Sequence, residues 1–374
     1  MIYLDSAATS LQKPPVVARA CSYAISHYAS PGRGGHKPAM DAAAAAFACR
    51  EAAARLFQVP KPEQVVFTNN ATHGLNIAIK ALVRPGGTVV ISGYEHNAVT
   101  RPLHAIPDVT VRVAAGQLFR PEETVEAFRK ALTPEVTAAV FTHVSNVFGM
   151  ILPIQELARL CRERGVPFIL DASQSAGCLP VHLEELGAAF IAMPGHKGLY
   201  GPQGTGLLLC GQTPPPLLEG GTGSESIRQE MPDFLPDRLE AGTHNMPGIA
   251  GLLAGVRFVR QLGPEAICAG ERQLTFQAAE GLRRLPGLQV FALPDLAAQA
   301  GVLSIVPERM DAEALGAALA DRGIAVRAGL HCAPLAHRTA GTLDTGTVRV
   351  SFSAFNTPQE ADRLAEAVGD ILRR

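Results

Sequence analysis

Short apolar runs alternate with longer amphipathic segments from about residue 62 to residue 171, and this alternation limits the fold of the chain more than any other feature. It predicts strands over residues 64–68, 88–92, 109–113, 137–143 and 166–170, with helices over 72–82, 98–105, 122–132 and 154–164 between them. Strands that alternate with helices of this length form a mostly parallel sheet with helices on both faces. The sequence therefore predicts an α/β fold for this part of the chain.

The rest of the chain has a different pattern. Residues 205–210 form a further apolar run, and the Pro- and Gly-rich stretch 211–237 predicts a long loop, of a length that is usually functional in compact domains. Helices are predicted over the alanine-rich residues 39–56 and over residues 247–262, 271–284, 311–322 and 358–372. We expect a large domain of residues 15–247 and a smaller α+β domain of residues 1–14 and 248–374.

The composition narrows the class of protein. With 374 residues, 47% of them hydrophobic and 18% charged, the chain can bury a large core. Its formal net charge of −1 argues against nucleic acid or an anionic membrane as the main partner. The apolar stretches are too short to span a membrane and the first residues lack a secretory pattern, so we expect a cytoplasmic protein. The seven cysteines include no CxxC pair, so neither a disulfide framework nor a metal site is predicted.

Lys197 lies in the segment PGHKGLYGPQG, residues 194–204, directly after the apolar run 188–192. A lysine at the end of a buried strand loses solvation, which makes its amine more nucleophilic. An enzyme could hold a Schiff-base lysine here. The same pattern also fits a lysine in a surface turn, because glycines mark turns in general.

Asp171 ends the apolar run 166–170, which is typical of a fully buried strand of a parallel sheet. Ligands gather at the carboxyl ends of such strands. Pyridoxal phosphate needs an acidic partner for its ring nitrogen, because the protonated ring is the electron sink that stabilises a carbanion. An aspartate that caps the next helix would give the same sequence pattern.

Six further segments join those of Lys197 and Asp171 to form an ordered set of motifs. They cover residues 3–10, 67–74, 95–99, 143–149, 239–245 and 326–334. In these motifs the chain resembles, over nearly its whole length, the class V aminotransferase family of fold-type I pyridoxal-phosphate enzymes, and within it the group II cysteine desulfurases. The resemblance implies a large domain with a mostly parallel, seven-stranded-type sheet, a smaller C-terminal α+β domain, pyridoxal 5'-phosphate as cofactor, and a homodimer with shared active sites.

The phosphate group of the cofactor is expected at the start of a helix, where free N–H groups bind anions. Ala71 and Thr72 lie at such a start, although a plain helix cap would look the same in sequence. The resemblance adds His196 and, from the partner subunit, Thr243. Pro194 stands where relatives commonly carry a hydroxyl group, so one hydrogen bond to the phosphate should be missing.

The resemblance also assigns residues to the cofactor ring. His96 would stack on the pyridine ring and take part in catalysis, and Asp171 would bind the ring nitrogen. Gln174 and Asn146 would hydrogen-bond the phenolic oxygen, while Lys197 would carry the cofactor. For Asn146, a simple turn residue before a glycine is the alternative interpretation.

Three arginines are candidates for binding the substrate. Arg349 lies in the alternating strand 347–352 and should face away from Val348 and Val350. An arginine there suits a planar carboxylate partner, and by resemblance it would hold the α-carboxylate of the substrate with help from Arg327. Arg33 matches a family loop near the active site. Arg349 could instead be exposed on its strand, and Arg33 could be an ordinary turn residue.

Cys332 decides which reaction the family resemblance implies. A thiolate is a strong nucleophile, and by resemblance Cys332 would attack the sulfur of bound L-cysteine, become a persulfide and leave L-alanine. Few residues separate Cys332 from Arg349 in the sequence. This short separation resembles that of the group II enzymes, which usually need a sulfur-acceptor protein. There are three alternatives: an L-selenocysteine lyase, another class V transaminase or lyase in which Cys332 is incidental, and a non-catalytic binding subunit. Leu330 bears on the preference between L-cysteine and L-selenocysteine.

Overall fold

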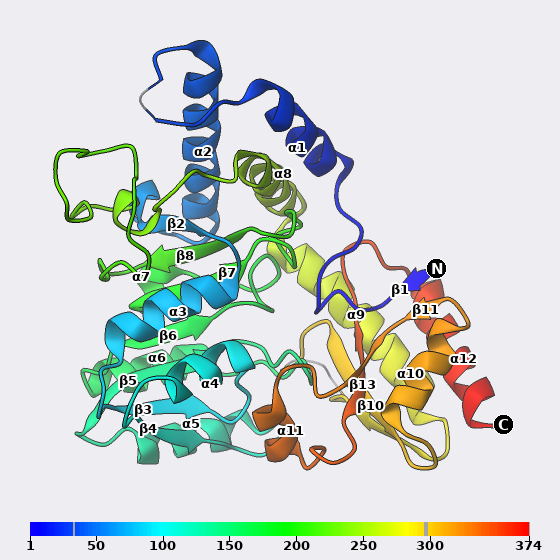
Figure 1. Ribbon diagram of the computed structural model, residues 1–374. Helices are drawn as coiled ribbons and strands as arrows, with labels where there is room; N and C mark the ends of the chain where they lie inside the picture. Colours follow the sequence, from blue (N-terminus) through cyan, green and yellow to red (C-terminus); the bar gives the residue numbers. More distant parts are fainter. Residues whose placement is uncertain (33, 295–297, 374) are drawn as a thin grey trace.

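The computed structural model describes residues 1–32, 34–294 and 298–373, and a seven-stranded sheet forms the centre of its larger part (Figure 1). In spatial order the strands are β2 (Val65–Thr68), β8 (Gly206–Cys210), β7 (Phe190–Pro194), β6 (Phe168–Asp171), β5 (Val136–Thr142), β3 (Thr88–Ser92) and β4 (Thr110–Ala114). Strands β7, β6, β5, β3 and β4 are parallel, whereas β8 runs antiparallel to both of its neighbours. The predicted mostly parallel sheet is confirmed.

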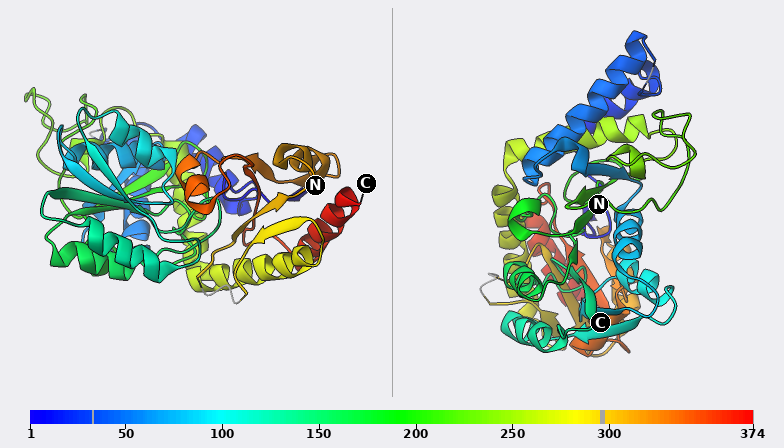
Figure 2. Two further views of the ribbon diagram at one scale, coloured as in Figure 1. Left: turned by 90° about the horizontal axis from the view of Figure 1, so that it is seen from below. Right: turned by 90° about the vertical axis from the view of Figure 1, so that its left-hand side faces the viewer.

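Helices cover both faces of this sheet, as the left view of Figure 2 shows. One face packs on α3 (Ala71–Leu82) and α4 (Asn97–His104), and the other on α2 (Lys37–Leu56), α5 (Pro121–Ala131) and α6 (Ile154–Glu163). The central strands are apolar on both sides because their residues alternate between the two cores. In β6, for example, Phe168 and Leu170 belong to one core and Ile169 to the other.

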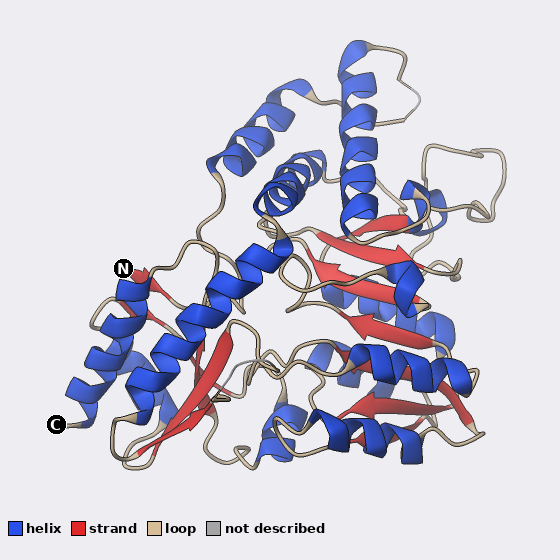
Figure 3. Ribbon diagram, turned by 180° about the vertical axis from the view of Figure 1, so that it is seen from behind, coloured by secondary structure: helices blue, strands red, loops and turns tan. Residues whose placement is uncertain are grey.

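A second, antiparallel sheet forms the smaller part of the molecule. Its strands in order are β12 (Arg327–Gly329), β13 (Thr347–Ser351), β10 (Val302–Pro307) and β9 (Leu288–Phe291). Helices α9 (Pro264–Arg283), α10 (Ala312–Ala320) and α12 (Pro358–Leu372) share an apolar core with this sheet. Figure 3 shows α9 as a long helix beside the sheet.

The first residues of the chain lie against this smaller part. Strand β1 (Ile2–Tyr3) pairs in parallel with β11 (Ile324–Ala325). Helix α8 (Met246–Leu262) packs against α1 (Pro15–His27) and α2, and its residues Ile249, Leu252 and Val256 belong to the apolar core of the larger part. The next helix, α9, shares the core of the smaller part. The division into residues 15–247 and residues 1–14 with 248–374 stays a prediction, in which α8 is the element that joins the two parts.

Four helices differ from the sequence prediction. Helices α1, α7 (Leu183–Leu186) and α11 (Pro334–Ala340) were not expected, and α9 begins seven residues before the predicted position 271. The long loop after β8 is confirmed, since residues 211–236 contain no helix or strand. Among the described residues, no helix is both long and apolar enough to cross a membrane.

Candidate active site

A cavity of about 100 Å³ lies at the carboxyl ends of β6 and β7, where the sequence predicted the site. It brings together eight predicted cofactor residues: Ala71, Thr72, His96, Asn146, Asp171, Gln174, His196 and Lys197. Pro194 lines the same cavity. Thr243 does not, and Arg33 lies outside the described residues.

Lys197 is held by a tight turn after β7. Gly195 donates its N–H to the carbonyl of Thr205 at 2.8 Å, and Tyr200 donates its N–H to the carbonyl of Lys197 at 2.9 Å. A Cβ atom on Gly195 would lie 2.2 Å from Thr205 Oγ1, and one on Gly198 would lie 2.4 Å from a backbone carbonyl. Both glycines are therefore required by close approach.

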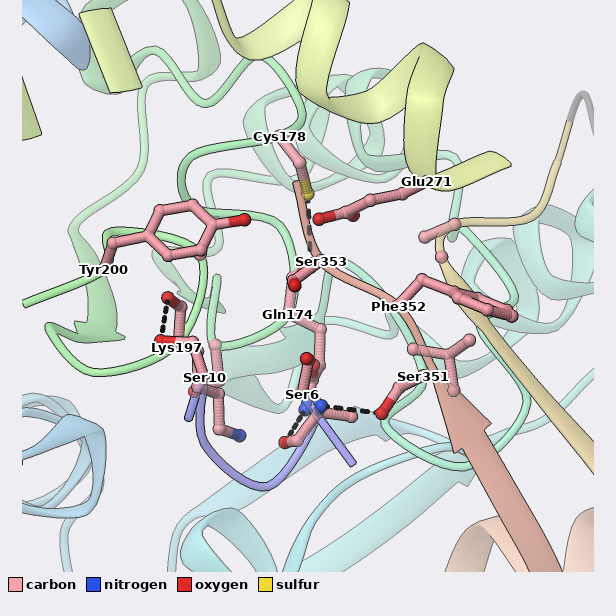
Figure 4. Close-up of a pocket in the computed structure, with 16 residues that line it drawn as sticks. Ser6, Ser10, Gln174, Cys178, Lys197, Tyr200, Glu271, Ser351, Phe352 and Ser353 are labelled. Carbon is pink, nitrogen blue, oxygen red and sulfur yellow. Dashed lines mark hydrogen bonds between the residues drawn. The ribbon is translucent and has the colours of Figure 1, made fainter. Parts of the chain in front are cut away.

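The electrostatic surroundings of Lys197 lower the pKa of its amine. Loss of solvation, aided by the positive charge of Arg349, lowers the pKa of Lys197 to about 8, although Asp171 and Asp5 act in the opposite direction. The Ser10 hydroxyl donates to the Lys197 carbonyl at 3.3 Å, which fixes the backbone from the N-terminal segment (Figure 4). The amine is thus close to the pKa range that suits a nucleophile or a general base.

Asp171 is 3% exposed and is fixed by the residue two positions later. Ser173 donates its backbone N–H to Asp171 Oδ1 at 2.9 Å, and its hydroxyl hydrogen-bonds the same oxygen. Among the described residues, Oδ2 of Asp171 accepts no hydrogen bond. It is free to accept a hydrogen bond from a ligand, such as the N–H of a protonated pyridine ring.

His96 is neutral and firmly oriented. It caps α4, and its Nδ1 accepts the backbone N–H of Ala98 at 3.0 Å, which leaves the ring proton on Nε2. Burial is the main reason that the pKa of His96 falls to about 4. A neutral imidazole at this place can stack on a planar aromatic ligand.

The start of α3 has the form of an anion site. Asn70 caps the helix by accepting the N–H of His73 at 2.9 Å. The N–H groups of Ala71 and Thr72, at the first turn, make no hydrogen bond within the described residues. The ring of His196, whose Nδ1 lies 3.0 Å from the Thr9 hydroxyl, lines the same cavity. These groups suit a phosphate.

Gln174 and Asn146 line the cavity but also hold other parts of the chain. Gln174 donates its amide to the carbonyl of Ala7 at 3.0 Å. Asn146 donates its amide to the carbonyl of His331 at 2.9 Å. Both side chains therefore connect the cavity to segments that are far away in sequence.

Arg349 is buried, with 2% of its side chain exposed, and faces away from the apolar core that contains Val348 and Val350, as predicted. Its Nη2 lies 2.7 Å from Asp5 Oδ1, and its Nη1 donates to the Asn146 carbonyl at 3.0 Å. Its Nε has no partner within the described residues. Nε is thus the one guanidinium nitrogen of Arg349 that makes no hydrogen bond within the described residues, and Arg349 does not itself line the cavity. Arg327 lies opposite Arg349 on the neighbouring strand.

Cys332 is exposed and does not line the cavity, and it has an unusual backbone conformation. The φ angle is 50° at His331 and 55° at Cys332, in the left-handed region that ordinary side chains avoid. The turn is held by Asn97, which donates its N–H to the Cys332 carbonyl at 2.8 Å, and by the amide of Asn146. Backbone strain of this kind often occurs at functional sites.

Thr243 is exposed and lies next to a buried ion pair that fixes its loop. Glu240 accepts from Arg50 Nη1 at 2.8 Å and lies 2.6 Å from His244 Nε2. The N–H of Phe67, in β2, also donates to Glu240 at 2.6 Å. The loop that carries Thr243 is therefore anchored to the strand that leads to the phosphate-type site.

Sequence reasoning missed several residues that shape the site. Asp5 holds Arg349, Ser173 orients Asp171, and Asn97 holds the turn of Cys332. All three lie inside or next to a segment that was singled out in the sequence. Their types, an acid, a hydroxyl and a turn-forming amide, gave no signal that separated them from ordinary neighbours.

Glu95, next to His96, gives the first testable prediction. It is fully buried, and burial is the main reason that its pKa rises from 4.5 to about 8. The unfolded chain releases this proton near pH 4.5 and the folded protein only near pH 8, so the free energy of unfolding falls as the pH rises between these values.

Glu95→Gln mimics the protonated acid. We expect the free energy of unfolding of the variant, minus that of wild type, to rise by a few kcal/mol as the pH rises from about 5 to about 8. One pKa unit corresponds to about 1.4 kcal/mol. Urea unfolding at several pH values measures this difference. Parallel pH profiles for the two proteins would show that Glu95 is ionised in the folded state at neutral pH.

Comparison with known proteins agrees with this geometry. The sequence profile of the family described as Aminotransferase class-V matches residues 2–364. A probable cysteine desulfurase of Xylella fastidiosa (strain Temecula1 / ATCC 700964) is 32% identical over 382 residues, covering 98% of this chain and 90% of that protein. A probable cysteine desulfurase of Methanothermobacter thermautotrophicus is 31% identical over 388 residues, covering 99% and 94%.

Solved structures give the same result. The apo structure of a cysteine desulfurase from Thermococcus onnurineus NA1 has a TM-score of 0.91 at 29% identity, covering 100% of this chain and 94% of that chain. The cysteine desulfurase CsdA of Escherichia coli, in an S-sulfonic acid form, has a TM-score of 0.87 at 27% identity, covering 99% and 94%. The predicted family and fold are confirmed: the chain belongs to the class-V aminotransferase family and is similar over nearly its whole length to cysteine desulfurases.

Proposed function

We propose that the protein is a cysteine desulfurase that converts L-cysteine to L-alanine and transfers the sulfur to Cys332. One observation carries this proposal: the cavity that holds Lys197 and Asp171 is tied directly to the turn of Cys332 through Asn146. The names of the relatives support the same activity. A transaminase would have no need for an exposed thiol on a strained turn that is tied to a residue of the cavity.

Pyridoxal phosphate fits the residues of the cavity. The free N–H groups of Ala71 and Thr72, with His196, would hold the phosphate, and the free oxygen of Asp171 would bind the ring nitrogen. Lys197 would bind the cofactor covalently, and His96 would stack on its ring, with Gln174 and Asn146 near the phenolic oxygen. When bound, the cofactor supplies an electron sink for negative charge at the α-carbon of the substrate.

Lys197 and the arginines would prepare the substrate. Arg349, whose Nε makes no hydrogen bond within the described residues, would bind the α-carboxylate with help from Arg327 on the neighbouring strand, and would fix the α C–H bond toward the amine of Lys197. Because the pKa of Lys197 is lowered to about 8, part of the amine is neutral near physiological pH and can take this proton.

Cys332 would then accept the sulfur. Its thiolate attacks the sulfur of the substrate, so that an S–S bond forms and the carbon–sulfur bond breaks, with the electron pair of that bond staying on the carbon. The carbon takes up a proton and leaves as L-alanine, and Cys332 is left as a persulfide. A thiol acceptor, which we propose to be a protein, must then remove the sulfur so that the enzyme can turn over again.

We also propose a homodimer in which Thr243 reaches the phosphate of the partner's site. Large apolar side chains are exposed on α1, α2 and the loop after β8: Val16, Tyr23, Ile25, Met40, Phe47 and Ile227. Figure 1 shows these three segments at the same end of the molecule. An extended apolar surface of this kind is typical of a subunit interface. The exposed Thr243 follows the same loop.

Alanine formation tests the proposed function. With pyridoxal phosphate, L-cysteine and a thiol reductant, we expect wild type to release L-alanine and Cys332→Ala to be slower by roughly 10³-fold or more, since the nucleophile is lost. Cys21→Ala is the matched control and should behave as wild type, because Cys21 lies on α1, outside the cavity. Equal alanine release by wild type and Cys332→Ala would contradict sulfur transfer to Cys332.

A further inference from the structure

Lys197 also lines a second cavity, of about 40 Å³ (Figure 4). Lys197, Ser173 and Gln174 line both cavities and form the wall between them. The remaining wall is rich in polar groups, among them Ser10, Tyr200 and Ser353. Since a water molecule needs about 10–15 Å³ of such space and several polar partners, the cavity can hold a short chain of water.

The carboxyl group of Glu271, on α9, points into this second cavity (Figure 4). This carboxyl group makes no hydrogen bond within the described residues, whereas the backbone carbonyl of Glu271 accepts one from the hydroxyl of Thr275. A Cβ atom on Gly301 would lie 2.9 Å from Glu271 Oε2 and 2.8 Å from Glu271 Cβ. The absence of a side chain at Gly301 thus makes room for this acid beside the cavity.

Glu271 is uncharged at neutral pH, because burial raises its pKa to about 8. The titratable groups beside it are neutral as well: burial is the main reason that the pKa values of the Tyr200 phenol and of the Cys178 and Cys268 thiols are raised. Arg272, the next residue on α9, lies beside Cys268. Among the residues that line the cavity, Lys197 is the one cationic side chain.

We propose that Glu271 stores a proton for Lys197 and exchanges it through water held in this second cavity. In the forward direction the O–H bond of the carboxyl group breaks, water passes a proton on, and an N–H bond forms on Lys197. A carboxylate and an ammonium result, and the reverse step restores the neutral pair. Glu271 is therefore a positioning residue that acts through Lys197, and this inference rests on the proposed role of Lys197 as the base.

The energetics allow exchange in both directions. Burial raises the pKa of Glu271 to about 8 and lowers that of Lys197 to about 8. A difference of one pKa unit corresponds to about 1.4 kcal/mol, so a proton moves between groups of nearly equal pKa at small cost. A base that must take a proton from substrate and later return one benefits from such a reservoir.

Exchange of the α-hydrogen of L-alanine in D₂O tests the proposal, with NMR as the readout and the protein loaded with pyridoxal phosphate. We compare wild type, Glu271→Gln and, as matched control, Glu265→Gln, which makes the same change at an exposed position of the same helix. Glutamine keeps the size of the acid but cannot give up a proton reversibly. We expect Glu271→Gln to exchange about tenfold more slowly, with unchanged cofactor loading and unchanged affinity for L-alanine.

Two further readouts separate a proton reservoir from a structural role. The exchange rate of Glu271→Gln should change less with pH near pH 8 than that of wild type, because Lys197 then titrates there without Glu271. The unfolding free energy of Glu271→Gln should fall by less than that of wild type between pH 4.5 and about 8, where Glu95 still contributes to the fall. Exchange by Glu271→Gln at the wild-type rate and pH dependence, or a loss that only follows loss of cofactor, would overturn the proposal. Wild type that exchanges L-alanine but makes none from L-cysteine would contradict the proposed function and not this inference.

Discussion

Replacing Lys197 by arginine is expected to lower alanine formation from L-cysteine by roughly 10⁴-fold or more. Arginine keeps the positive charge but stays protonated at any pH at which the protein is folded, so it can neither form the covalent link nor take a proton. The tight turn of Gly195 and Gly198 holds this side chain at the cavity, and no other lysine lines it. The rate of alanine formation at saturating L-cysteine measures the effect.

The covalent link offers an independent check on Lys197→Arg. Borohydride reduction of the loaded protein followed by peptide mass analysis should find pyridoxal phosphate on Lys197 of wild type and on no residue of the variant. The matched control is Lys37→Arg, since Lys37 is exposed and forms a surface pair with Asp41. Activity within tenfold of wild type in Lys197→Arg would mean that another group is the base.

Arg349→Lys is expected to lower kcat/KM for L-cysteine by about 10²–10³-fold, mainly through KM. The lysine keeps the charge that pairs with Asp5 but has no planar fork, so it cannot hold a carboxylate through two parallel N–H groups. Because the arginine is 2% exposed, water cannot replace the lost contact easily. Steady-state kinetics over a range of L-cysteine concentrations separate KM from kcat.

A ligand without a carboxylate shows whether the defect of Arg349→Lys lies in carboxylate binding. We expect 2-aminoethanethiol, which otherwise resembles L-cysteine, to inhibit wild type and variant with similar affinity. A variant that binds L-cysteine normally but turns it over slowly would instead place Arg349 in the chemical step. Equal weakening for both ligands would indicate a general disruption of the site around Asp5 and Asn146.

Local patterns made much of the fold predictable. Strands β3, β5 and β6 are apolar on both faces, and that property identifies a parallel sheet covered by helices. Helix α11 was missed because its seven residues are too few to show a helical period. The start of α9 was placed too late because Gly270 weakens the helical signal of its first two turns.

The meeting of the candidate site residues was predictable where they belong to a local motif. Lys197 after β7 and Asp171 at the end of β6 meet in one cavity because the carboxyl ends of neighbouring parallel strands lie at the same edge of a sheet. Asp5 and Arg349 form an ion pair although they lie 344 positions apart in the sequence. Glu271 and Lys197 line the same cavity although they lie on different elements. Such approaches depend on how the two parts of the molecule pack, which no short pattern encodes.

The mass of the peptide that contains Cys332 tests the central claim most directly. Loaded protein is mixed with L-cysteine without reductant, quenched with an alkylating reagent and digested. We expect the Cys332 peptide to gain the mass of one sulfur atom, in step with the L-alanine formed in the first turnover, and the peptides of the other cysteines to gain none. L-alanine formed in that turnover with no added sulfur on Cys332 would contradict the account.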